Sequence, residues 1–451
     1  MKQLSPRSRA WLIGGLVIVV AGAIAAWFLL PPRALSFAGG RTVSLADYKG
    51  PSPVGVPAEL RSGDLVTRGR YLTQAADCEV CHTREGGEPF AGGRAFKTPF
   101  GVLYSPNITA DPETGIGAWT DTDFLRAVHK GIARNGERLY PAFPYDSYTL
   151  IADEDVRAIK AYLFSLPMVH ATAPPNGLRF PFNQRWLMGI WAAFYNPDQR
   201  FRPHQDRSAD WNRGAYLAEA LAHCGDCHTP RNLAQALNNR RKFAGAVTAG
   251  WRAYNITAHP VSGIAAWSDA DLAEYLHSGH AAGRGLAGGP MAEEIDVSTS
   301  TLTAADLQAL ITYLRSIPPV RTRDLPASRM VPASDSPDSM RAGLDPRGKE
   351  IFEGACVSCH GWSGVSLLTS YATLTGDRAV NDPSAINVAQ IVLSGELRHT
   401  AEGVVLMPSF GDAYSDTEIA AVANYVTARF GAVPSHLTAG DVAGLRKLSS
   451  H

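Results

Sequence analysis

Three stretches with one pattern organise this sequence: Cys78-Glu79-Val80-Cys81-His82, Cys224-Gly225-Asp226-Cys227-His228 and Cys356-Val357-Ser358-Cys359-His360. Together they use all 6 cysteines of the 451-residue chain. In each stretch a histidine directly follows the second cysteine. On a helix this spacing puts the two thiols about one turn apart and holds the imidazole beside them. The pattern therefore predicts three equivalent sites, each with two sulfur atoms and one ring nitrogen.

The arrangement Cys-x-x-Cys-His is the attachment signature of haem c. Two thiols at this spacing can bond to the two vinyl-derived carbons on one side of a porphyrin, and the adjacent imidazole then lies under the iron. The sequence predicts three haem c groups, attached through six cysteines and ligated by three proximal histidines: Cys78, Cys81, Cys224, Cys227, Cys356 and Cys359, with His82, His228 and His360.

Three other uses of paired cysteines explain the pattern less well. Structural disulfides do not require a histidine after every pair. A thioredoxin-like pair is expected near a βαβ unit, whereas these flanks have helical patterns. Two pairs could share one zinc ion, but the third pair and the histidines would then be unexplained.

The three signatures lie in a repeat. Arg68-Gly69-Arg70-Tyr71-Leu72, Arg213-Gly214-Ala215-Tyr216-Leu217 and Arg347-Gly348-Lys349-Glu350-Ile351 precede them. The first two units also share an Asn-Ile-Thr stretch, at 107–109 and 255–257, and a tryptophan before a helix N-cap, Trp119 and Trp267. Apolar periodicity predicts a closing helix in each unit, over 155–166, 306–317 and 418–430. We predict an all-α fold with three tandem cytochrome c domains behind one N-terminal transmembrane helix.

The domain boundaries follow from this repeat and from the composition between the units. The segment 169–205 is too apolar for a free linker, whereas 321–341 is rich in proline, serine and aspartate. The predicted division is an N-terminal anchor at 1–33, domains at 60–168, 206–320 and 342–432, an apolar connector at 169–205, a linker at 321–341 and a tail at 433–451.

The N-terminus predicts a membrane anchor. Lys2, Arg7 and Arg9 precede an uncharged stretch from Trp11 to Leu30, about the 20 residues that a transmembrane helix needs. A cleaved signal peptide is the alternative, although its apolar core is normally about 7 to 15 residues long. Either interpretation exports the rest of the chain. The expected location is the inner membrane, with the haem domains on its periplasmic side.

Composition argues against other functions. The 42 basic residues balance the 42 acidic ones, and no basic patch with interleaved aromatic residues stands out, so nucleic acid is not an expected partner. We find neither a flavin or nicotinamide fingerprint nor a nucleophile elbow.

Methionine is the usual second axial ligand of electron-carrying c-type haems. Met291, after Gly288-Gly289-Pro290, and Met407, before Pro408, are the candidates in the second and third domains, and both are predicted to lie in loops. Met291 is 24 residues after Trp267; the same count from Trp119 reaches Phe143, which cannot ligate iron. For the first haem the open alternatives are Met168, Met188, His129 or a five-coordinate iron.

Roughly residues 60–432 resemble the tri-haem cytochrome c subunits of membrane-bound periplasmic dehydrogenases. The resemblance rests on the three signatures, Asn107-Ile108-Thr109 followed by 115–119 (Gly-Ile-Gly-Ala-Trp), the Arg-Gly-Ala-Tyr-Leu lead-in, 227–231 (Cys-His-Thr-Pro-Arg) and Met407-Pro408. It implies an electron-transfer subunit without a substrate site of its own, which passes electrons from a catalytic dehydrogenase subunit to ubiquinone.

The loop Tyr140-Pro141-Ala142-Phe143-Pro144-Tyr145 resembles the branch that serves molybdopterin aldehyde dehydrogenases, which implies such a partner, with an iron-sulfur subunit as a further candidate partner. The alternatives are a quinoprotein alcohol dehydrogenase or a flavoprotein sugar or gluconate dehydrogenase as partner. A haem peroxidase that uses an open first haem and a freestanding membrane cytochrome remain competing functions.

Overall fold

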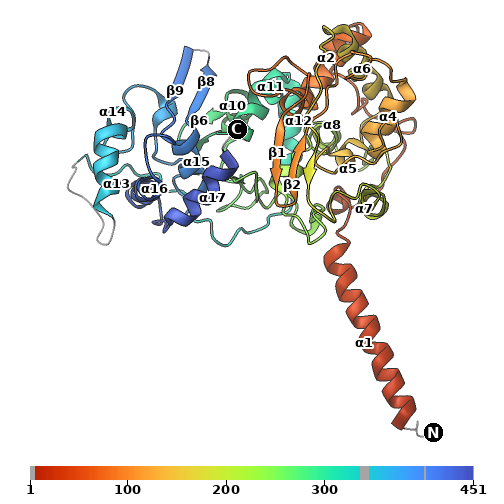
Figure 1. Cartoon of the computed structure of the whole chain (residues 1–451), viewed down its shortest axis with the longest axis horizontal. Coiled ribbons are helices and arrows are strands. Elements are labelled where there is room, and N and C mark those ends of the chain that lie inside the picture. Colours follow the sequence, from red (N-terminus) through yellow and green to blue (C-terminus); the bar gives the residue numbers. More distant parts are fainter. Residues whose placement is uncertain (1–5, 336–344, 401–402, 450–451) are drawn as a thin grey trace.

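A computed structural model describes residues 6–335, 345–400 and 403–449. Lys2 of the predicted anchor, residues 336–341 of the predicted linker and residues 342–344 of the predicted third domain lie outside these ranges. Figure 1 shows a body with helices α2–α7 at one end and α13–α17 at the other, and α1 extending away from it. Helices and short hairpins alternate along the chain.

The helices are α1 (Pro6–Leu29), α2 (Leu65–Ala75), α3 (Cys78–His82), α4 (Asp121–Lys130), α5 (Tyr145–Tyr148), α6 (Asp153–Ser165), α7 (Leu187–Tyr195), α8 (Ala209–Tyr216), α9 (Gly225–His228), α10 (Asp269–Ser278), α11 (Pro290–Val297), α12 (Ala304–Arg315), α13 (Pro346–Ile351), α14 (Val357–His360), α15 (Ile386–Ser394), α16 (Asp416–Phe430) and α17 (Ala439–Ser449). Two π-helical turns, η3 (Leu217–Leu221) and η6 (Phe352–Cys356), continue α8 and α13. The strands are β1 (Ala95–Thr98), β2 (Gly101–Tyr104), β3 (Gly177–Leu178), β4 (Ala246–Thr248), β5 (Trp251–Ala253), β6 (His280–Ala281), β7 (Gly285–Leu286), β8 (Glu396–Thr400) and β9 (Gly403–Met407).

The same helix crossing occurs three times, between α2 and α6, α8 and α12, and α13 and α16. The glycine of each Arg-Gly lead-in lies at the crossing. A Cβ atom on Gly69 would collide with the carbonyl oxygen of Ala158, and one on Gly214 with that of Ala309. Glycine is needed there because only a residue without a side chain lets the two backbones approach this closely. The predicted closing helices agree with α6, α12 and α16 to within a few residues.

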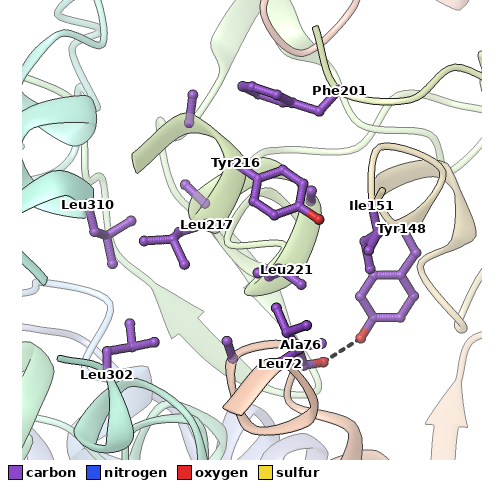
Figure 2. Packing of buried hydrophobic residues seen from close by; sticks show 14 of the residues in the cluster. Leu72, Ala76, Tyr148, Ile151, Phe201, Tyr216, Leu217, Leu221, Leu302 and Leu310 are labelled. Carbon is purple, nitrogen blue, oxygen red and sulfur yellow. Dashed lines mark hydrogen bonds between the residues drawn. The ribbon is translucent and has the colours of Figure 1, made fainter. Parts of the chain in front are cut away.

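The first two repeats share one buried core. A continuous apolar cluster extends from Ala38 to Ile317, and Figure 2 shows Leu72, Tyr148, Phe201 and Tyr216 within it. These four side chains come from both repeats and from the segment between them. Burying aromatic and aliphatic surface across the repeats stabilises them as a single packed unit.

Reciprocal hydrogen bonds reinforce this packing. The Tyr71 hydroxyl of the first repeat donates to Asp306 Oδ2 at 2.6 Å, and the Tyr216 hydroxyl of the second donates to Asp155 Oδ2 at 2.6 Å. The tyrosines hold equivalent positions in the two lead-ins, and both carboxylates lie in the first turn of a closing helix. The two repeats therefore exchange the same bond in both directions.

The third repeat is built differently at this point. Its lead-in has Glu350 where the others have tyrosine. A carboxylate cannot donate the bond that a tyrosine hydroxyl gives to another carboxylate. Helices α13 to α17 enclose a separate apolar cluster around Phe352, Tyr425 and Phe430.

The prediction of an all-α fold is wrong. The structure contains a three-stranded antiparallel sheet, β1-β2-β3, and three two-stranded hairpins, β4-β5, β6-β7 and β8-β9. Two to five residues per strand are too few to give a clear alternating pattern. Turns with left-handed glycines, such as Gly250 (φ 78°), close some of these hairpins. The sequence prediction followed the long helical periods and overlooked the short strands.

The predicted transmembrane anchor, and with it the predicted inner-membrane location, is also corrected. Across the ranges that the structure describes, no helix combines the length and the apolar character needed to cross a bilayer. The prediction rested on the apolar, charge-free composition of residues 11–30.

The apolar segment 169–205 packs on the body as expected. In α7, the Trp191 indole donates to the Ala234 carbonyl at 2.9 Å and its ring lies 5.8 Å from that of Tyr145. The segment thus contacts both of the first two repeats. Its outer side leaves Trp186 and Phe194 exposed.

Candidate functional site

The three predicted iron-ligating histidines share one geometry. The Nδ1–H of His82 donates to the Pro106 carbonyl at 2.8 Å, that of His228 to Tyr254 at 2.6 Å, and that of His360 to Ala372 at 2.6 Å. A carbonyl can only accept, so Nδ1 carries the hydrogen and Nε2 keeps its lone pair. Burial lowers the pKa of each imidazole, which favours this neutral form.

In the first two repeats the Asn-Ile-Thr stretch holds this carbonyl in place. Pro106 and Tyr254 directly precede the asparagines. Asn107 Oδ1 accepts from the Thr109 backbone at 2.9 Å, and its Nδ2 donates to the Val169 carbonyl at 2.7 Å. Asn255 makes the same two bonds, with Thr257 and Val320. The motif therefore orients the histidine, as partners of metal-bound histidines do in other proteins.

The six cysteines all carry free thiols. Cys227 and Cys359 are exposed and the others are half-buried. Burial raises the pKa of Cys78 to about 12 and that of Cys356 to about 11. Without a bound group such thiols stay protonated at neutral pH. Free paired thiols beside an imidazole with an available Nε2 fit the covalent attachment of haem c.

The zinc alternative needs a cluster of ligands. Throughout the described ranges, no three Cys, His, Asp or Glu side chains gather as a metal-ion site. The arrangement that two cysteine pairs would form around a shared zinc is thus absent from those residues.

One cavity of about 2750 Å³ brings together several predicted site residues. Its lining includes Cys224, Cys227, His228 and Met291 of the second repeat, together with Cys81 and Met407. Cys78, His82, Cys356, Cys359 and His360 are not in this lining. Trp267, Leu310 and Leu314 add apolar walls around the second-repeat set.

The two predicted methionine ligands lie in regular structure and not in loops. Met291 is the second residue of α11. The helix begins at Pro290, because proline suits the first helical position, where no N–H is needed. Met407 is the last residue of β9, paired with Glu396 across the hairpin. Met407 and Cys356 both pack against the apolar cluster of the third repeat.

The first repeat has no methionine at this place. Phe143 packs against the same core as Tyr148, with ring centroids 5.4 Å apart. Of the alternatives, Met168 is 68% exposed, and buried His129 lies 3.8 Å from Asp153 and outside the cavity lining. Met188 on α7 does line the cavity.

Sequence reasoning missed a buried ionic network near the second site. Lys242 Nζ donates to Glu219 Oε2 at 2.6 Å, and the Tyr313 hydroxyl donates to the same carboxylate. Both charged side chains are 5% exposed. Glu219 lies on the π-helical turn η3, and π-turns inside helices often mark functional sites. No local sequence signal pairs Glu219 with Lys242.

Each repeat has two helices that cross at a glycine, a Cys-x-x-Cys-His turn after the first of these helices, and a histidine that is hydrogen-bonded to a backbone carbonyl. Together these features define a c-type cytochrome. Comparison with known proteins leads to the same class. The family model for the cbb3-type cytochrome c oxidase subunit III matches residues 344–426.

Curated relatives cover much more of the chain. The fructose dehydrogenase cytochrome subunit of Gluconobacter japonicus is 38% identical over 84% of this chain and 82% of its own length. The gluconate 2-dehydrogenase cytochrome c subunit of Pantoea cypripedii is 34% identical over 85% and 90%. A nicotinate dehydrogenase subunit of Pseudomonas putida is 40% identical over 82% of this chain, which spans only 31% of that longer relative. The chain belongs to the family of dehydrogenase cytochrome c subunits, and it is an electron-transfer protein that carries haem c.

Proposed function

We propose that this chain carries three haem c groups and relays electrons from a catalytic dehydrogenase subunit to ubiquinone. The observation that carries the proposal is the threefold recurrence of one arrangement, a free cysteine pair beside a histidine whose Nδ1–H is bound to a carbonyl. Haem c supplies the one-electron chemistry. The chain attaches the groups through six cysteines and ligates their irons through His82, His228 and His360, with Met291 and Met407 as second ligands of two of them.

The identity of the partner is inferred from the resemblance and the relatives. The relatives are named for nicotinate, fructose and gluconate dehydrogenases, which supports a catalytic dehydrogenase as partner. Phe143 in the loop 140–145 favours a molybdopterin aldehyde dehydrogenase, with an iron-sulfur subunit as a further candidate partner. A quinoprotein alcohol dehydrogenase or a flavoprotein sugar dehydrogenase is the alternative.

The large cavity supports a lipophilic electron acceptor. Its lining also includes apolar side chains of α7 and of the end of α1, among them Leu29, Trp191 and Phe194, together with Phe100. A quinone ring and its apolar tail suit such a lining.

The test is to purify the chain with its native partners through an affinity tag. We expect about three haems per chain from the haemochrome absorbance, and reduction of these haems by the substrate of the co-purifying subunit. Addition of a short-chain ubiquinone analogue should reoxidise them. The double variant Cys224→Ala/Cys227→Ala should keep about two haems. A wild-type chain with fewer than three haems, or no substrate-dependent reduction of the complex, would contradict the proposal.

A further inference from the structure

The helix α11, which carries Met291 of the second repeat, is held by side chains of the third. Glu396 Oε2 on β8 accepts from the Gly289 backbone N–H at 3.1 Å. Arg398 Nη1, also on β8, donates to the Ala292 carbonyl at 3.1 Å. One of these contacts lies before Met291 in the sequence and the other directly after it. The third repeat therefore holds the backbone on both sides of the predicted ligand.

Arg398 makes most of this contact. Although it comes from a short hairpin, it is only 2% exposed. Its Nη2 donates to the carbonyl of Ser278, the last residue of α10, at 3.0 Å, and pairs with Asp296 of α11 at 2.9 Å. A guanidinium has five N–H donors in a fixed planar fork. One side chain thus ties β8 to α10 and α11 and fixes how these two helices lie relative to each other.

The loop before α11 is closely packed. A Cβ atom on Gly289 would collide with the Trp251 indole of β5, and one on Gly288 would lie 3.2 Å from the Ile391 side chain of α15. Trp251 belongs to the second repeat and Ile391 to the third. Side chains of both repeats therefore enclose this loop. Because packed interiors are stiff and transmit displacements, a shift of the third repeat would move the start of α11.

The same hairpin ends at the other predicted methionine ligand. Met407 is the last residue of β9 and lies directly opposite Glu396 in the register, whereas Arg398 lies opposite Val405. The hairpin β8-β9 thus carries Met407 for its own repeat and holds the helix that carries Met291 for the neighbouring one.

We propose that Arg398 and Glu396 of the third repeat are positioning residues for Met291 of the second. Arg398 is not part of the cavity lining, so it acts through the two helices that it ties together. Glu396 acts through the backbone N–H just before α11. Together they set where α11 presents the Met291 thioether beside the second signature. The inference rests on the role of Met291 proposed above.

The experiment uses the full haem-loaded chain and two readouts, the carbon monoxide difference spectrum of the reduced protein and amide hydrogen exchange of α11. A displaced thioether leaves a coordination position that carbon monoxide can occupy. In Arg398→Met the carbon monoxide signal should rise above the wild-type level, towards that of Met291→Phe, and the α11 amides should exchange faster.

Glu396 provides an independent pair of variants, which also decides the test if Arg398→Met fails to fold. Glu396→Ala removes the acceptor of the Gly289 N–H and should raise both readouts. Glu396→Gln should behave as the wild type, because its amide oxygen still accepts this bond. Equal behaviour of the two Glu396 variants would overturn the inference.

Arg252→Met is the matched control. Arg252 crosses the same interface between the second and third repeats, but its ion pairs are with Asp382 at 3.0 Å and Asp324 at 2.6 Å, neither of them on α11. This variant should lower the midpoint of thermal unfolding and leave the carbon monoxide spectrum as in the wild type. A rise equal to that of Arg398→Met would mean that any loosening of the interface displaces Met291, which would overturn the specific role of Arg398.

Failure of the proposed function is distinguishable from failure of this inference. If Met291→Phe itself left the carbon monoxide spectrum unchanged, Met291 would not be a ligand, yet faster exchange of α11 in Arg398→Met would still show the contact between the repeats. If Met291→Phe raised the signal while Arg398→Met and Glu396→Ala matched the wild type in both readouts, only the positioning role would be overturned.

Discussion

The first and second repeats have nearly the same scaffold, but they differ at the position where a second axial ligand is predicted. Both have a glycine at the helix crossing, an Asn-Ile-Thr stretch that fixes the histidine-bound carbonyl, and a capping box before the tryptophan-led helix. They differ in two places. The first repeat has Phe143 where the second has Met291, and the second repeat buries an ion pair between Glu219 and Lys242. The shared features hold the histidine of each signature, whereas the residue at the Phe143 or Met291 position can vary without disturbing them.

Exchanging the distal residues should have the largest effect. Met291→Phe should leave the second iron without sulfur, so that it binds carbon monoxide when reduced and its potential falls by on the order of 0.1 V. Phe143→Met should act in the opposite direction on the first iron. Carbon monoxide difference spectra and potentiometry would measure both. Unchanged spectra in Met291→Phe would show that Met291 is not a ligand.

Breaking the buried ion pair between Glu219 and Lys242 should have the second-largest effect. Lys242→Met leaves Glu219 buried without its cation, which should lower the free energy of unfolding by about 3–5 kcal/mol. The first repeat offers a control: Lys130 and Asp198 pair at 2.9 Å, but both are about half exposed. Lys130→Met should cost less than about 1 kcal/mol. If denaturant unfolding showed the same loss of unfolding free energy in both variants, burial would not be what makes the Glu219–Lys242 pair important for stability.

The reciprocal tyrosine bonds allow a finer comparison. Among the described residues, Tyr216→Phe leaves Asp155 with the Gly55 backbone as its remaining donor, at 2.8 Å, and should cost about 1.5–3 kcal/mol. Tyr71→Phe should cost less, since Arg213 still donates to both oxygens of Asp306. Thermal unfolding of the two variants checks the order. The reverse order would mean that Arg213 does not compensate.

The helix caps should show the smallest effects and no difference between the repeats. Thr120 accepts from the Asp123 backbone at 3.2 Å and Ser268 from that of Asp271 at 3.0 Å. Thr120→Ala and Ser268→Ala should each cost about 1 kcal/mol. Unfolding measurements that separated the two variants by more than this amount would show that the scaffolds are less alike than their contacts indicate.

Much of the candidate site follows from the sequence because its parts are adjacent along the chain. Cys224, Cys227 and His228 lie on one short helical segment, and the Thr120 and Ser268 caps are local signals that the structure confirms. Elements of two to five residues were missed, as was the helical setting of Met291. The predicted membrane anchor was wrong, since no helix within the described ranges is long and apolar enough to cross a membrane.

By itself the sequence determined the chemistry, because thiols and imidazoles at fixed spacing act together wherever the chain places them. Only the tertiary structure decided how the repeats combine. Tyr71 meets Asp306 across 235 positions, and Lys242 meets Glu219 inside the core. Contacts between distant residues depend on how whole helices pack, and no local pattern specifies that packing.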